Sequence, residues 1–174
     1  MRPFPVLPPT DCRVVLPSAD FCDAFAIDVP DPALDAPEAA RRAFARQPRW
    51  ITVLLALRNA VVSPLGLKTG ADHNLPKQQR FGIFPILSSS PQRVVLGFDD
   101  RHLDFRIVID VVARGDSLRR AIATTLVRRH NVFGRAYLAA VLPFHKVIVP
   151  ATLSRLCDGS IRPMDPGAVS GGKA

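Results

Sequence analysis

The sequence predicts an α+β domain in which an antiparallel sheet packs against long apolar helices. Alternation of apolar and polar residues recurs between short turns in the second half of the chain, as in antiparallel strands. Two segments, 49–63 and 132–156, are apolar at helical spacing. The length of 174 residues and the hydrophobic share of 48% suit one globular domain.

The ends of the chain differ in composition from the part between them. Prolines crowd residues 1–15, so we expect an extended or mobile Pro-rich arm there. Residues 16–157 predict the single α+β domain, and Gly, Pro and Ser in 158–174 predict a disordered tail. The domain opens with a strand over 24–29, where apolar residues occupy every second position: Phe25, Ile27 and Val29.

Two helices are predicted after this strand. Pro37 fits the first turn of a helix and Glu38 favours its positive end, so a helix is expected over 36–46. Residues 49–63 are apolar on nearly every side, which is typical of a mostly buried helix.

Four further strands are predicted as an antiparallel meander, over 80–87, 93–98, 102–112 and 118–129. Pro85 predicts that the first is an edge strand or a bulged strand. The strand over 102–112 is expected to have a dry face made of Leu103, Phe105, Ile107, Ile109 and Val111. Its other face is expected to be solvated and salt-bridged, with His102, Asp104, Arg106 and Asp110.

A long helix over 132–156 is predicted to close the domain, with Asn131 as its N-cap. Its predicted buried face comprises Phe133, Tyr137, Ala140, Phe144 and Ile148. Pro143 and Pro150 remove backbone donors and should bend the helix, so that it can follow a curved sheet.

This order of elements resembles the helix-grip architecture of START-like and Bet v 1-like proteins. The resemblance implies a curved antiparallel sheet wrapped around the C-terminal helix and an apolar cavity between them. Three groups of residues are similar to those of a bacterial family of uncharacterised domains: 65–70 (LGLKTG), 99–106 (DDRHLDFR), and His130-Asn131 followed by Gly134-Arg135, Tyr137 and Pro143-Phe144-His145. Proteins of that family sometimes carry the domain C-terminal to a Rossmann-type reductase domain, and the family implies no established chemistry.

Composition argues against several classes of function. The net charge of +8 comes from Arg residues scattered along the chain, so a nucleic-acid interface is not expected. Three cysteines do not make a disulfide framework, and the N-terminus lacks the apolar core of a signal peptide, which predicts a cytoplasmic protein. The apolar stretch 51–67 is interrupted by Arg58, Asn59 and Pro64, so no membrane span is expected.

The four histidines, His73, His102, His130 and His145, show no zinc-ligand spacing, so neither a metal nor a cofactor is predicted. His130 and His145 are candidate general bases, because imidazole titrates near neutral pH. The alternative is that each histidine ties the last helix to the sheet by hydrogen bonds.

Three functions remain open from the sequence. The first is a binding domain whose cavity holds a small hydrophobic ligand, lined by Phe105, Ile107, Ile109, Tyr137, Val141 and Phe144. The second is an enzyme of the polyketide cyclase or dehydratase type that uses the same cavity, with His130, His145 or Tyr137 as acid or base. The third is an interaction protein or a homodimeric scaffold.

Overall fold

The computed structural model describes residues 1–9, 11–44, 79–82 and 84–157. These residues form seven strands and three helices. Their bounds are β1 (Phe4–Val6), α1 (Cys12–Val15), β2 (Phe21–Val29), α2 (Ala36–Phe44), β3 (Arg80–Phe81), β4 (Phe84–Ser89), β5 (Arg93–Asp99), β6 (Leu103–Ala113), β7 (Arg119–Arg129) and α4 (Val132–Ser154). The predictions for 49–63, 158–174 and His73 fall outside the described residues.

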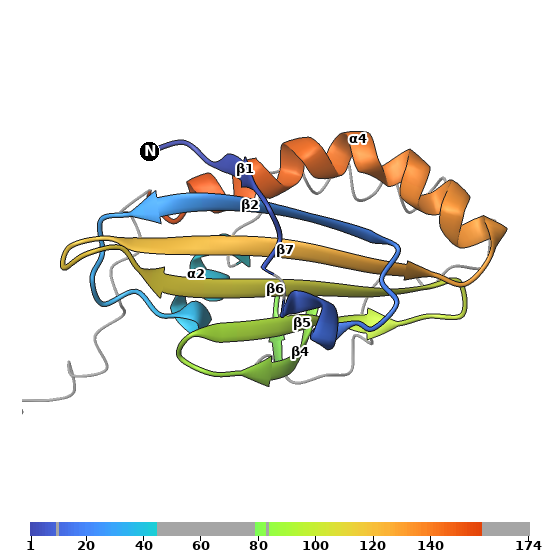
Figure 1. Ribbon diagram of the computed structural model, residues 1–174, viewed down its shortest axis with the longest axis horizontal. Helices are drawn as coiled ribbons and strands as arrows, with labels where there is room; N and C mark the ends of the chain where they lie inside the picture. Colours follow the sequence, from blue (N-terminus) through green and yellow to red (C-terminus); the bar gives the residue numbers. More distant parts are fainter. Residues whose placement is uncertain (10, 45–78, 83, 158–174) are drawn as a thin grey trace, which may run out of the picture.

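The seven strands form one antiparallel sheet in the order β1-β2-β7-β6-β5-β4-β3 (Figure 1). The predicted meander is confirmed, because β4, β5, β6 and β7 follow one another as hairpins. The strand expected over 80–87 is instead two strands, since the chain turns at Gly82 with a φ of 60°. The irregularity expected beside Pro85 is present as a shift of register between Ile86 and Ser88.

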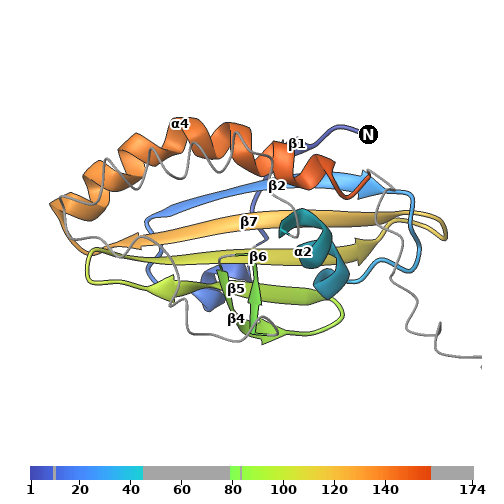
Figure 2. The ribbon, with the colours of Figure 1, turned by 180° about the vertical axis from the view of Figure 1, so that it is seen from behind.

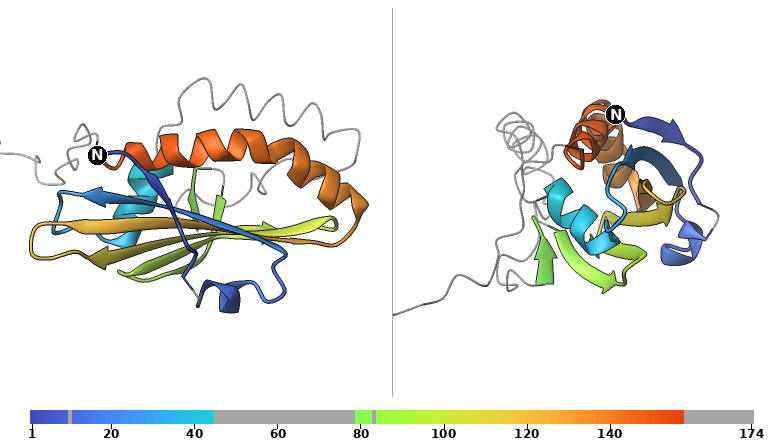
Figure 3. Two further views of the ribbon diagram at one scale, coloured as in Figure 1. Left: turned by 45° about the horizontal axis from the view of Figure 1, so that its top comes forward. Right: turned by 90° about the vertical axis from the view of Figure 1, so that its left-hand side faces the viewer.

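Two of the described helices lie on one face of the sheet. Figure 2 shows α4 running along the strands with α2 beside its C-terminal end, and the end-on view in Figure 3 shows the strands curling around both. The apolar face of α2 is made of four alanines and Phe44, and the small alanines let it approach the sheet closely. Strand order and the position of α4 confirm the predicted helix-grip architecture of the α+β class.

The expectation of a solvated second face was wrong. On β6, Val108 is fully buried and the carboxylates of Asp104 and Asp110 are also buried. The N-terminal segment explains this difference, because α1 lies against that face and packs Cys12 and Leu16 on Val108. The segment predicted as a Pro-rich arm therefore contributes β1 to the sheet edge and α1 to a second layer of packing.

The buried face of α4 also differs from the expectation. Gly134, Leu138 and Leu153 are buried, whereas Phe133 and Phe144 are exposed. The helix α4 is apolar around most of its circumference, so two different sides of it have the spacing of apolar residues that is typical of a buried face. Among the described helices, α4 alone has the length and mean hydropathy (1.5) of a membrane span, a property shared by core helices of soluble proteins.

Candidate functional site

One candidate histidine faces the sheet from the middle of α4. The Nε2 atom of His145 lies 3.0 Å from both carboxylate oxygens of Asp23 on β2. Both side chains are mostly buried, and the ring of Phe21 meets the imidazole edge-on at 6.2 Å between centroids. A carboxylate only accepts hydrogen bonds, so Nε2 of His145 is the donor in this contact. The pair can therefore orient the histidine for proton transfer.

The second candidate histidine belongs to a different cluster. His130 Nε2 lies 3.0 Å from Oδ1 of Asp104, and Arg128 Nε donates to Oδ2 of the same carboxylate at 2.9 Å. Burial raises the pKa of Asp104, but the hydrogen bonds from His130 and Arg128 outweigh it, and the net shift is downward. Asp104 lies opposite Arg128 in the register and pairs with it across the ladder, whereas Arg106 pairs with Asp99.

The two clusters lie on opposite faces of the sheet. Residues directly opposite one another on antiparallel strands point to the same side, and Asp23, Thr125 and Ile107 form one such row. Ile107 packs in the core beneath α2 and α4. Asp104 is an odd number of residues away from Ile107 on β6, so its side chain points to the opposite face. Only the His145–Asp23 pair thus shares a face with α4.

A hydrogen-bonded corner fixes the start of α4. The predicted N-cap is confirmed, since Oδ1 of Asn131 accepts from the backbone N–H of Gly134 at 3.1 Å. The same amide contacts Nδ1 of buried His102, and Arg101 lies 3.3 Å from the other ring nitrogen. Gly134 lies so close to β6 that a Cβ atom there would be 2.2 Å from the carbonyl oxygen of His102. His102 is therefore a structural link between β6 and α4.

The predicted ligand-lining residues occupy different environments. Ile107 and Ile109 are buried in the core, and Phe144 is exposed on the outer side of α4. The other three, Phe105, Tyr137 and Val141, are half-buried on the side where α4 and the sheet face each other. The six residues thus do not line one common surface.

Aromatic rings that the sequence did not single out surround Phe105. Its ring lies 5.8 Å from that of Phe84 on β4 and 5.7 Å from that of Phe98 on β5, and Phe84 contacts Phe44 of α2 at 5.5 Å. Alternation along each strand could have placed these rings on the α4 side, but only the strand order brings them together.

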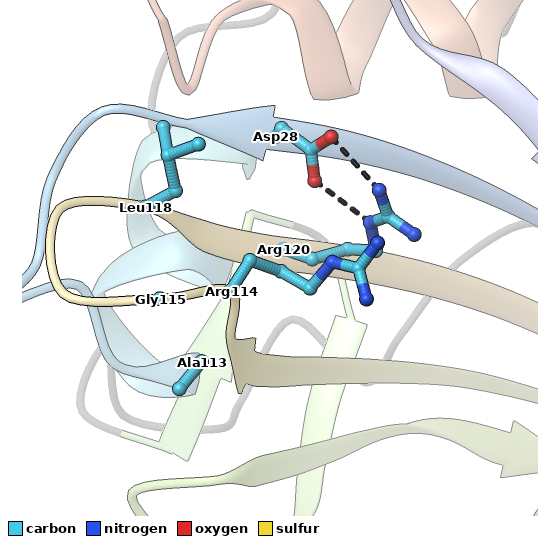
Figure 4. A pocket seen from close by; sticks show the side chains of 6 residues that line it. All are labelled: Asp28, Ala113, Arg114, Gly115, Leu118 and Arg120. Atoms are coloured by element: carbon cyan, nitrogen blue, oxygen red, sulfur yellow. Dashed lines mark hydrogen bonds and ion pairs between the residues drawn. The ribbon is translucent and has the colours of Figure 1, made fainter.

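A pocket of about 480 Å³ opens at the other end of the sheet, at the hairpin between β6 and β7 (Figure 4). Its lining includes Asp28, which accepts two hydrogen bonds from Arg120, at 2.7 and 2.8 Å, and the side chain of Arg114. The hydrogen bonds from Arg120 lower the pKa of Asp28. The pocket is polar and open, and none of the predicted ligand-lining residues belongs to it.

Within the described ranges, no group of three His, Cys, Asp or Glu side chains could hold a metal ion. The described residues on the α4 side form an apolar, aromatic surface with a histidine–carboxylate pair at its edge.

The fold defines the protein as a helix-grip α+β domain, with a C-terminal helix laid along an antiparallel sheet. The chain belongs to the DUF2867 family, described as a protein of unknown function, which it matches over residues 15–152. No curated protein matches the chain. A solved START superfamily protein from Mycobacterium smegmatis is similar at 8% identity and a TM-score of 0.39, covering 78% of this chain and 98% of that one.

Proposed function

We propose that the protein is a cytoplasmic binding domain that holds a small hydrophobic molecule between α4 and the sheet. The observation that carries the proposal is the uneven burial of α4. Leu138 and Leu153, toward the two ends of the helix, are buried against the sheet. Between them, Val141 belongs to the same sheet-facing side by helical periodicity, but it is only half-buried.

The sheet beneath this part of α4 also carries an apolar side chain that is only partly buried. Phe105 contacts the buried cluster around Leu138 and also the larger cluster around Leu153, yet it remains half-buried between them. Binding sites for small ligands are mostly apolar and aromatic, with a few placed polar groups. Phe105, Tyr137 and Val141 supply the apolar part of such a site, and His145 with Asp23 supplies a polar end.

This arrangement fits a ligand with an apolar body and one hydrogen-bonding group. A neutral fluorescent probe, N-phenyl-1-naphthylamine, tests for such a site without attraction to the net charge of +8. Val141→Trp places a large side chain between α4 and the sheet, so we expect it to weaken probe binding at least tenfold. Val147→Trp is the matched control, because Val147 is exposed on the same helix. Equal affinity in the two variants would reject this location.

A second candidate function is an enzyme of the polyketide cyclase or dehydratase type, favoured by the His145–Asp23 pair. A carboxylate that fixes the tautomer of a histidine is a common arrangement for general acid–base catalysis. We expect His145→Gln to abolish turnover of β-ketoacyl thioesters, while His130→Gln, on the opposite face, retains it. An inactive wild-type protein, or equal rates in both variants, excludes His145 as the base.

A further inference from the structure

The exposed side of α4 is apolar over its first four turns. Val132 is 73% exposed, Phe133 50%, Phe144 37% and Val147 57%. The remaining exposed positions of this stretch are small or basic: Arg135, Ala136, Ala139, Ala140, Pro143 and Lys146. A helix surface of this kind is unusual for a protein that meets only water, and exposed apolar patches mark interaction sites.

Helical geometry arranges these residues in one band. At about 100° per residue, all ten exposed positions fall within one half of the helix circumference. Arg135 and Lys146 are eleven residues apart, about three turns, so they share one border of the band. Phe133 and Phe144 have the same spacing and share the other border. The band thus has a basic edge, a core of small apolar residues and an aromatic edge.

The charged residues of the band itself, Arg135 and Lys146, have one sign. Between Asp116 and Asp158 the chain contains seven basic residues and no acidic one. Strand β7 carries four of them, and at least three pair with carboxylates: Asp28 of β2, Asp104 of β6, and Asp20, which precedes β2. Within the described part of the chain, by contrast, no carboxylate pairs with Arg135 or Lys146. A partner for this face must therefore offer negative charge next to an apolar interior.

We propose that this face of α4 docks the protein on an anionic lipid bilayer, with the helix lying in the plane of the interface. Interfacial helices combine an inserted apolar face with Lys or Arg at its border, and they favour anionic lipids. A second copy of the chain fits less well, because its own band carries no acidic residue that could balance Arg135 and Lys146. The helix does not cross the bilayer, since Leu138 and Leu153 pack on the sheet.

Flotation with phosphatidylcholine vesicles, with and without phosphatidylglycerol, tests the proposal on the full chain. We expect binding to the mixed vesicles that falls with added salt, and little binding to phosphatidylcholine alone. Arg135→Gln combined with Lys146→Gln should weaken binding roughly fivefold per removed cation. Phe144→Ser combined with Val147→Ser should weaken it at least tenfold, because both side chains leave water on docking.

The matched control combines Leu87→Ser on β4 with Val112→Ser on β6, which are similarly exposed but lie outside α4. This variant should bind as the wild type does. Absence of wild-type binding to the mixed vesicles overturns the proposal, and so does an equal loss in the control variant. A dimer in sedimentation equilibrium that Phe144→Ser with Val147→Ser dissociates, without vesicle binding, would show that a second copy covers this face.

Discussion

Asp104 accepts hydrogen bonds from His130 and Arg128 while its own side chain is only 4% exposed. A buried carboxylate depends on such partners, because burial alone disfavours its charged form. The three residues join β6, β7 and the approach to α4 on the face of the sheet away from that helix. They therefore act as a structural anchor for the end of the sheet at which α4 begins.

This anchor predicts a dependence of stability on acid. The pKa of Asp104 in the folded protein is below its ordinary value, so its contribution is complete above that ordinary value of about 4 and is lost as the pH falls further. Asp104→Asn should lower the free energy of unfolding at neutral pH by about 1.5–3 kcal/mol. It should also flatten the loss of stability between about pH 5 and pH 2. Urea denaturation at several pH values measures both effects.

Asp99→Asn serves as the control, since Asp99 pairs with Arg106 at the same end of the sheet but is well exposed. We expect a change below about 1 kcal/mol, as for surface ion pairs. Similar curves for the two variants would contradict the role assigned to Asp104.

The partners of the histidines could not be predicted from the sequence. His145 and Asp23 are 122 residues apart, and their contact depends on where α4 crosses β2. The partner of Asp104 lies across the ladder, on Arg128, and only the register of β6 against β7 reveals it. The sequence shows which residues can form hydrogen bonds and ion pairs. Which of them pair with one another can be known only from the register of the strands.

At the level of elements, α4 shows which properties of a helix can be predicted from its periodicity and which cannot. Its start and its N-cap at Asn131 follow from local sequence and are confirmed, whereas its end at Ser154 comes before the predicted end at 156. The rotation of α4 about its own axis does not follow from local sequence. The side of the helix that carries Phe133 and the side that carries Leu138 are both apolar, so either could have faced the sheet. The close approach at Gly134 selects the side that faces the sheet.

Gly134→Ala tests this contact. In an exposed helical position the change would stabilise the protein by up to about 1 kcal/mol, because alanine favours helix. Here the added Cβ would meet the carbonyl oxygen of His102 at 2.2 Å, so we expect destabilisation by about 1–3 kcal/mol instead. The midpoint of urea unfolding measures it. Ala136→Ser, at an exposed position half a turn away, should change stability little, and an equal effect of the two would refute the contact.

At the level of the whole molecule, short turns between alternating segments were sufficient to predict the meander and the helix-grip order. The layer formed by α1 on the opposite face was not predictable, because residues 1–9 are rich in proline and α1 has only four residues. Its packing depends on Cys12 and Leu16 meeting Val108, a contact between distant parts of the chain. The face of the sheet that packs against α4 could be predicted from the alternation of apolar and polar residues along each strand.

The proposed function depends on a binding site between α4 and the sheet. Titration of isotope-labelled protein with N-phenyl-1-naphthylamine, followed by NMR, tests it most directly. We predict saturable chemical-shift changes centred on Phe105, Tyr137 and Val141, with smaller changes at Val108 and Leu126, whose side chains lie on the opposite face. Saturable changes centred on that opposite face, or no changes at all, would contradict a binding site beneath α4.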